Sequence, residues 1–404
     1  MGVHYTGRPL DPTRFAGVRI LFTDLHLLPA SSGEKMQFAA IENVIRTNID
    51  PRRGGPYLLV LWTKHEETVG RLATHLERRL EPDKKPLAVL SLDKAKFLED
   101  GALKDAEGLR DAIIERVHHS AQLQALLGWE ADVLAAAGAT LAEVGELVPL
   151  EGRRDSLSFS RELDGVLSRL AVAAVGAPNV QRDKRGAINT ALAPLLSDRI
   201  LNSPAQAQDA DLWASAITRA QDLPAVDDHQ VGRMNRMLHL SLPPRELTTP
   251  GDWGAVIALP PEALSKGEME ARFGMQAATL LNQLFLVERA DRPRCKLVLI
   301  RIGAICDYAQ NKPGPILYVA GCIIPVSVVR RDSQALLSEL ASPIFEWDEA
   351  EGPVCLFVNA RLQITMASAP EWPVLFRIRE TLLRAMAEHC ANYATRTGII
   401  KWPL

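Results

Sequence analysis

The run Tyr57-Leu58-Leu59-Val60-Leu61-Trp62 is uninterrupted apolar sequence of strand length, and it follows the turn-forming run Arg52-Arg53-Gly54-Gly55-Pro56. Shorter apolar runs lie on either side of it, at residues 18–23 and 87–90. Segments with helical periodicity, residues 34–47 and 66–80, separate the three runs. Strands that are apolar on both faces and alternate with helices predict an α/β domain with a parallel sheet over residues 1–103.

Residues 104–245 have a different pattern, which is typical of helices. Amphipathic periodicity predicts helices over residues 105–118, 120–147, 158–175 and 186–201. Ser158 or Ser160 is the expected N-cap of the third helix, and Pro194 either kinks or breaks the fourth. The middle block is therefore predicted to be a helical domain.

Residues 246–404 are β-rich. Strand-like apolar runs lie at 284–287, 296–302, 316–320 and 354–358, with Gly, Pro, Asp and Asn between them. We expect a small antiparallel sheet or barrel, closed by an amphipathic helix over residues 373–394. The predicted fold class is thus an α/β N-terminal domain, a helical middle and a β-rich (α+β) C-terminal domain.

The composition is that of an ordinary folded protein. The 404 residues include 46 basic and 49 acidic side chains, and 47% are hydrophobic, which excludes collagen-like, disordered and disulfide-scaffold classes. No block carries the basic excess typical of phosphate-backbone binding, so a nucleic-acid partner is not expected. No run approaches the roughly 18 apolar residues of a membrane span, and there is no signal peptide. The five cysteines form no CxxC pair, so we predict a cytoplasmic protein without a membrane segment.

Three polar residues follow the three predicted strands of the first block: Asp24, Thr63 and Lys94. In open α/β sheets, functional sites form at the carboxyl ends of the strands. Neighbouring strands would bring a carboxylate, a hydroxyl and an ammonium group into one cleft. Two other interpretations stay open: Asp24 caps the following turn, and Lys96 takes the place of Lys94.

These residues give the first quarter of the chain a resemblance to the receiver domains of bacterial response regulators. The resemblance rests on Leu21-Phe22-Thr23-Asp24-Leu25-His26-Leu27-Leu28-Pro29, and on Thr63 and Lys94 after two later strands. It implies a flavodoxin-like fold and a phosphoacceptor carboxylate at Asp24. It also implies that Thr63 and Lys94 bind the phosphoryl oxygens.

The chain departs from the receiver pattern at its beginning. A receiver normally starts with a strand that ends in two acidic residues, which hold a magnesium ion. Residues 1–23 precede Asp24 here, and Asp11 is the single carboxylate among them. We therefore expect a receiver-like domain that lacks its first strand and helix. Mg²⁺ is a candidate cofactor, although its acidic pair is not evident.

A second candidate site lies in Ile302-Gly303-Ala304-Ile305-Cys306-Asp307-Tyr308-Ala309-Gln310. This run loosely resembles a motif of uncharacterised bacterial proteins from phage-defence gene neighbourhoods. One interpretation makes Cys306 a nucleophile or sensor thiol with His389 as its base. The other places Cys306 in the core and Asp307 in a turn.

The favoured hypothesis is a signal-relay protein of bacterial antiviral defence rather than an enzyme. It would act through protein–protein interaction and through phosphoacceptance at Asp24, with a sensor-kinase-like or effector protein as its partner. One alternative is a hydrolase or nuclease effector with its site around Cys306 and Asp307. The other is a non-catalytic scaffold subunit of a defence complex.

Overall fold

The computed structural model describes residues 18–29, 31–49, 57–63, 66–99, 102–118, 120–153, 155–202, 207–242, 248–329, 339–348 and 350–395. The chain divides into two compact units. The N-terminal unit contains Met1–Ala131 and Pro204–Thr218, and the C-terminal unit contains Asp132–Ser203 and Arg219–Leu404. The helical middle of the chain therefore contributes residues to both units.

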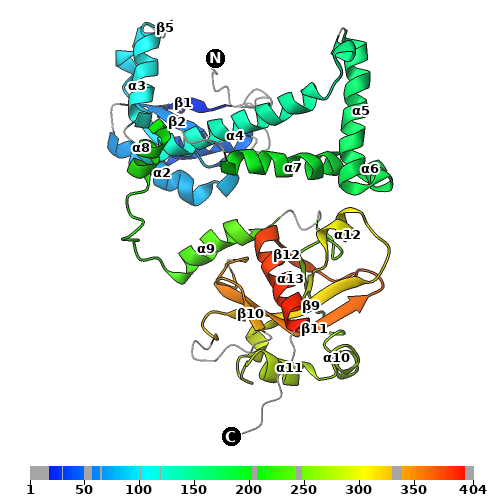
Figure 1. Cartoon of the computed structure of the whole chain (residues 1–404). Helices are drawn as coiled ribbons and strands as arrows, with labels where there is room; N and C mark the ends of the chain where they lie inside the picture. Colours follow the sequence, from blue (N-terminus) through cyan, green and yellow to red (C-terminus); the bar gives the residue numbers. More distant parts are fainter. Residues whose placement is uncertain are drawn as a thin grey trace. The chain divides into compact units, whose positions relative to one another are not determined.

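The N-terminal unit is built on a three-stranded parallel sheet (Figure 1). Its strands are β1 (Ile20–Asp24), β2 (Leu58–Trp62) and β3 (Ala88–Leu92), and β2 lies between the other two. The crossover connections contain α1 (Glu34–Asn48) and α2 (Glu66–Arg79). The predicted α/β block with a parallel sheet is confirmed.

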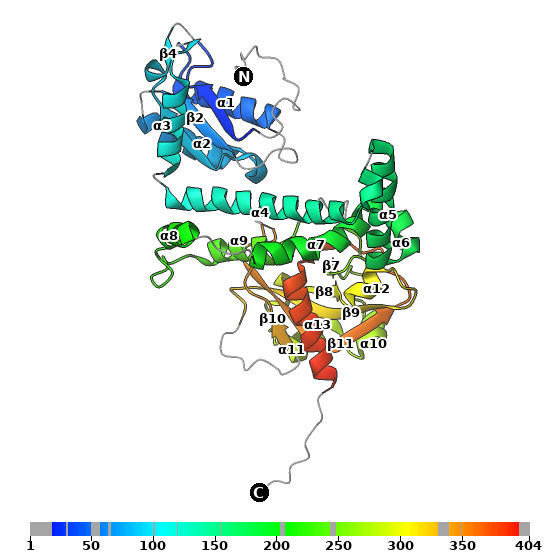
Figure 2. The same cartoon turned by 45° about the horizontal axis from the view of Figure 1, so that its top comes forward.

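Both faces of β2 are covered, which explains its uninterrupted apolar sequence. Leu59 and Leu61 are fully buried against apolar side chains of α1 and α2. Val60, which points to the opposite face, is buried with Phe97 and with apolar residues of α3 (Ala106–His118). Figure 2 shows the sheet with these three helices around it. The site at the strand ends therefore rests on a sheet that is held from both sides.

Smaller elements complete the N-terminal unit. The strands β4 (Leu98–Glu99) and β5 (Ala102–Leu103) pair in an antiparallel hairpin. Two 3₁₀ turns, Pro82–Lys84 and Lys94–Lys96, flank β3, and α8 (Ala207–Ala216) joins the unit from later in the sequence.

The helix α4 (Ala121–Glu146) runs from residues of the N-terminal unit into residues of the C-terminal unit. Within the described residues it is the one helix that is long and apolar enough to cross a membrane, and little of its apolar part is buried. The exposed fractions of Leu134 and Leu141 are 61% and 65%. A search for uninterrupted apolar runs misses this helix because Glu130 and Asp132 interrupt it.

Helices α5 (Ser156–Val175), α6 (Ala177–Arg182) and α7 (Lys184–Asn202) open the C-terminal unit after a 3₁₀ turn at Leu150–Arg153. Buried residues of α5 and α7 pack together around Ala171 and Ala187. The middle of the chain is helical, as predicted. It continues through α9 (Asp228–His239) to the sheet.

Two local predictions about these helices are resolved. The N-cap of α5 is Asp155, whose carboxylate accepts hydrogen bonds from the backbone N–H groups of Leu157 and Ser158. The prediction of Ser158 or Ser160 as N-cap was wrong, because both serines lie inside the helix. Pro194 lies within α7, which continues past it.

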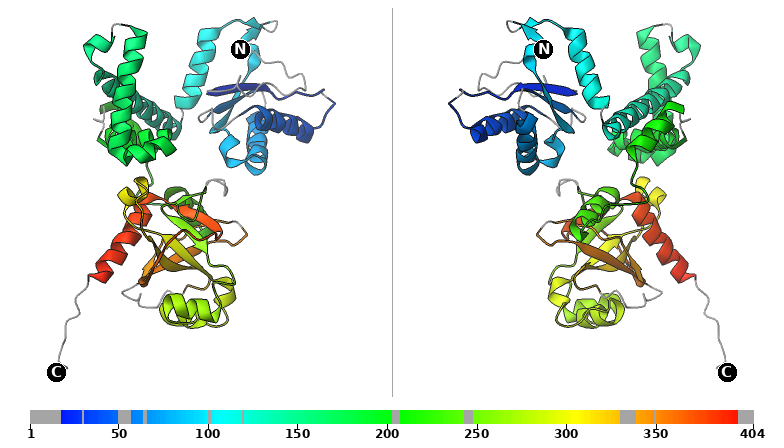
Figure 3. Two further views of the ribbon diagram at one scale, coloured as in Figure 1. Left: turned by 90° about the vertical axis from the view of Figure 1, so that its right-hand side faces the viewer. Right: turned by 90° about the vertical axis from the view of Figure 1, so that its left-hand side faces the viewer.

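The β-rich block forms a curled seven-stranded sheet whose neighbouring strands are all antiparallel (Figure 3). The strand order is β10-β11-β9-β8-β7-β12-β6. The strands are β6 (Leu240–Ser241), β7 (Ala255–Ala258), β8 (Lys296–Arg301), β9 (Ile316–Pro325), β10 (Glu339–Ala341), β11 (Val354–Met366) and β12 (Val374–Ile378). The predicted antiparallel, β-rich C-terminal block is confirmed.

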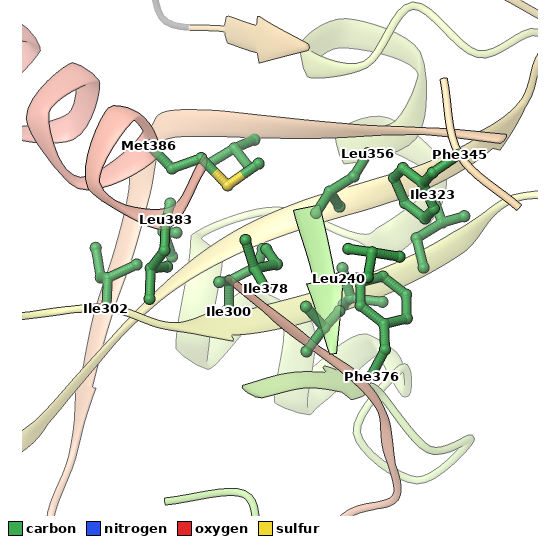
Figure 4. Close-up of a cluster of buried hydrophobic side chains, with 14 of the residues drawn as sticks. Leu240, Ile300, Ile302, Ile323, Phe345, Leu356, Phe376, Ile378, Leu383 and Met386 are labelled. Carbon is green, nitrogen blue, oxygen red and sulfur yellow. The ribbon is translucent and has the colours of Figure 1, made fainter. Parts of the chain in front are cut away.

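Helices cover both faces of this sheet. On one face, α13 (Glu380–Ala394) places Leu383 and Met386 among side chains of the sheet, as Figure 4 shows. On the other face, α10 (Lys266–Phe273) and α11 (Ala277–Leu284) pack against a second apolar cluster. Both clusters contain buried side chains of β8, which precedes the short helix α12 (Ile305–Ala309).

Two elements of the C-terminal block differ from the predictions. Residues 284–287, predicted as a strand, contain the end of α11 and a turn in which Leu286 has a φ of 54°. Residues 373–394, predicted as one helix, contain β12 before α13 begins. Pairing of β12 with β7 and β6 outweighs the helical pattern, since Phe376 and Ile378 are buried in the sheet.

Candidate functional site

The strand ends of the N-terminal sheet carry the residues that we predicted to form a site. In the parallel register, Asp24 lies beside Trp62 and Trp62 lies beside Leu92. Thr63 follows Trp62 directly, and Lys94 is the second residue after Leu92. The register therefore brings the backbones of all three positions to the same edge of the sheet, at the carboxyl ends of its strands.

The loop after Asp24 is fixed by side-chain hydrogen bonds. Oδ1 of Asp24 accepts a hydrogen bond of 3.2 Å from the backbone N–H of His26, so this carboxylate also organises the turn. Gln37 of α1 accepts from the backbone N–H of Leu28 and donates to its carbonyl, both at 3.0 Å. Gln37 is only 2% exposed. The sequence reasoning missed this role of Gln37. Its signal was a polar residue at helical spacing from the buried Ile41.

Of the other two predicted residues, the structure describes Thr63 with its side chain and Lys94 by its backbone alone. Thr63 is buried, and its backbone N–H donates to the carbonyl of Leu92 at 3.0 Å. The side chain of Lys94 and all of Asp11 lie outside the described residues. Across the ranges that are described, no group of three or more His, Cys, Asp or Glu side chains could hold a metal ion.

The second predicted pair, Cys306 and Asp307, lies on α12 with both side chains exposed. Oδ1 of Asp307 accepts from the Cys306 thiol at 3.7 Å and from the Lys312 ammonium at 2.7 Å. The hydrogen bond and charge of Lys312 lower the pKa of the Asp307 carboxyl. Among the residues described, no histidine is hydrogen-bonded to Cys306, so the pairing of thiol and base that activates a nucleophile is not formed there.

Residues from separate segments surround α12 and form a cleft of about 960 Å³. Tyr308 donates a hydrogen bond of 2.8 Å to Asp252, and burial, together with this bond, raises the pKa of its phenol to about 12. Arg301, the last residue of β8, also lines the cleft. The sequence reasoning missed Arg301 and Asp252, because the sheet brings them together from positions far apart in the chain.

Comparison of the chain with protein-family models, with curated proteins and with solved structures gives no match.

Proposed function

We propose that this chain is a signal-relay protein whose N-terminal unit is receiver-like and accepts a phosphoryl group on Asp24. The observation that carries the proposal is the parallel order of β1, β2 and β3. It places a carboxylate, a hydroxyl and the backbone of a lysine at successive strand ends, in the same order as in a receiver. Helices on both faces of the sheet add support, because a flavodoxin-like fold is covered in this way.

The proposed chemistry is a single phosphoryl transfer. A carboxylate oxygen of Asp24 forms a bond to the phosphorus atom, and the bond between phosphorus and the donor's leaving atom breaks; that atom is an oxygen in acetyl phosphate and a histidine nitrogen in a sensor-kinase-like donor. Thr63 and Lys94 would then stabilise the charge on the transferred group. The turn held by Gln37 supports this role, since it fixes the backbone that follows the acceptor.

Partners and cofactor belong to the same proposal. We infer a protein partner, either a sensor-kinase-like phosphodonor or an effector of a bacterial defence system, in the cytoplasm. Among the described residues, no group of three or more His, Cys, Asp or Glu side chains could hold a metal ion, and we assign no step to Mg²⁺. Comparing phosphorylation in the presence of Mg²⁺ and of a chelator will show whether labelling depends on it.

The test is direct labelling of the full chain with acetyl phosphate. Intact-mass spectrometry should detect the addition of one phosphoryl group, and hydroxylamine should remove it, because the product is an acyl phosphate. The Asp24→Asn variant should lose the label. Asp93→Asn, which removes a carboxylate at the end of β3, is the matched control and should keep it.

Labelling of the Asp24→Asn variant to the same extent as the parent chain would contradict the assignment of the acceptor. Absence of any label on the parent chain, with and without Mg²⁺, would contradict phosphoacceptance as a whole. The Thr63→Ala variant should be labelled more slowly while its acceptor stays intact, because a group that stabilises the transferred charge has been removed.

A further inference from the structure

The guanidinium of Arg301 is not fully hydrogen-bonded by the protein. Its backbone is fixed in β8, where it lies opposite Tyr318 of β9 and its carbonyl accepts from the Gly254 N–H at 2.9 Å. The guanidinium donates to the carbonyl of Ile302. Its Nε is buried and has no hydrogen-bond partner among the described residues. A buried donor without a partner is costly, so the protein's own groups leave the guanidinium of Arg301 incompletely satisfied, and a ligand in the cleft would meet the exposed part of that group.

The nearby carboxylates form no ion pair with Arg301, although the charge of Asp307 acts to raise its pKa. Asp307 is bound to Lys312 at 2.7 Å, and Asp252 accepts both the Tyr308 hydroxyl and the Thr249 N–H. No carboxylate in the described part of the chain lies within ion-pair distance of Arg301. Burial lowers the pKa of Arg301, although an arginine still keeps its charge.

The cleft beside Arg301 has the size and lining of a small-molecule site. Its volume, about 960 Å³, is at the upper end of the roughly 300–1,000 Å³ that such sites occupy. Trp253 and Arg301 both line the cleft, and Ile305, Pro313 and Ile316 supply apolar surface. Trp253 is itself held in place, since its indole N–H donates to the Gly303 carbonyl at 3.1 Å.

We propose that this cleft binds a small organic anion. Its carboxylate or phosphate group pairs with Arg301, and its apolar body lies against Trp253 and Ile316. A planar guanidinium with free donors suits both kinds of oxyanion, because it can bond to two oxygens at once. The proposal is independent of phosphoacceptance at Asp24, which belongs to the other unit.

Substitution of Gly303 provides a second test of the role of the Arg301 guanidinium. Its φ is 119°, and a Cβ atom there would lie 2.8 Å from Nη1 of Arg301. A side chain at this position would therefore push the guanidinium aside while leaving its charge on the protein. The Gly303→Ala variant therefore displaces Arg301 without removing its charge, and circular dichroism must first show that it folds, because a side chain at this positive φ strains the backbone.

The experiment uses three probes with the same ring: benzoate, phenyl phosphate and the neutral benzyl alcohol. Binding to the full chain is measured by calorimetry and by ligand-detected NMR. We expect at least one of the anions to bind and benzyl alcohol not to. Arg301→Gln should weaken binding of that anion by about tenfold or more, the effect of losing a charge-assisted hydrogen bond. Arg361→Gln, which removes an exposed arginine of β11, is the matched control and should bind as the parent does.

The pattern of binding decides the outcome. Tighter binding of phenyl phosphate identifies a phosphate ligand, and tighter binding of benzoate identifies a carboxylate. The proposal is overturned if neither anion binds, if benzyl alcohol binds equally well, or if Arg301→Gln binds like the control. If Arg301→Gln does not fold, Arg301→Lys and Gly303→Ala take its place, and unchanged anion binding in both would overturn the proposal as well.

Discussion

At the scale of single residues, Glu42 on α1 joins two helices through its carboxylate. It accepts from Arg46 at 2.9 Å and lies 2.9 Å from Nε2 of His75 on α2, and its side chain is only 11% exposed. Burial acts to raise the pKa of Glu42, but the hydrogen bonds to Arg46 and His75 outweigh it, so the pKa lies below the ordinary 4.5. The ionised form is therefore favoured by folding.

We predict that Glu42→Gln lowers the free energy of unfolding of the N-terminal unit by about 1–3 kcal/mol at pH 7. Because the folded-state pKa is lowered, the stabilisation by Glu42 is present above pH 4.5 and is lost as the pH falls through the folded value. The difference between the parent and the variant should shrink accordingly in urea titrations at decreasing pH. Glu77→Gln, which removes an exposed carboxylate of α2, is the control. Equal losses in the two variants would contradict this account.

Gly321 in β9 is a residue that permits close approach of strands. A Cβ atom there would lie 2.7 Å from the Phe357 carbonyl oxygen and 2.9 Å from Cδ1 of Ile300. We predict that Gly321→Ala lowers the free energy of unfolding of the C-terminal unit by about 1–3 kcal/mol, since the sheet cannot move apart to accept a methyl group. The measurement is urea-induced unfolding, with Gly267→Ala as the control because its Cβ would meet no atom within 4 Å. A loss no larger than that of the control would show that the strands adjust.

At the scale of elements, α5 depends on a cap that the sequence reasoning misplaced. The backbone hydrogen bond from Ser158 is the main cause that lowers the pKa of Asp155 below 3.8. We predict that Asp155→Ala destabilises α5 at pH 7, whereas Asp155→Asn, also a good N-cap, retains its stability. The stabilisation by the charged carboxylate is present above pH 3.8 and is lost as the pH falls through the folded value.

Hydrogen exchange of α5 amides checks the prediction for Asp155. Exchange should be faster in the Asp155→Ala variant at neutral pH, while Asp155→Asn should follow the parent there and show less dependence on pH in acid. Faster exchange in both variants at neutral pH would mean that the charge, rather than the hydrogen bonds, holds the helix end.

Local sequence patterns predict an element well where its burial leaves a local apolar signature. The run 57–62 and its flanking helices predicted the parallel sheet, because burial on both faces leaves a local apolar signature. β12 was missed because its helical periodicity is local, whereas the ladders with β7 and β6 that make it a strand are not. The turn at Leu286 was also missed, because its positive φ occurs within a run of residues that is apolar throughout.

At the scale of the whole molecule, the candidate sites show the same difference between local sequence signals and contacts that only the fold creates. Asp24, Thr63 and Lys94 could be selected from sequence because each lies at or within two residues of the end of a strand, and parallel strands end at one edge. Arg301 and Asp252 could not, since their proximity depends on the pairing of β7 with β8 and on the loops around them. The role of Gln37 could not be predicted from the sequence either, because its hydrogen-bond partners are backbone groups of a loop.

The division into two units has a consequence for folding. Leu59 is fully buried in a cluster made of N-terminal residues, and Leu356 is fully buried in a cluster made of C-terminal residues. We predict that Leu59→Ala lowers the stability of the N-terminal unit by about 2–5 kcal/mol, the usual cost of a core cavity. It should leave the C-terminal unit unchanged, and Leu356→Ala should do the reverse, because the two clusters share no residue. Hydrogen exchange resolved by peptide measures both units in one experiment. If either variant lost protection equally in β2 and β9, the chain would unfold as a single cooperative body, and tests at Asp24 and Arg301 would then need controls for global stability.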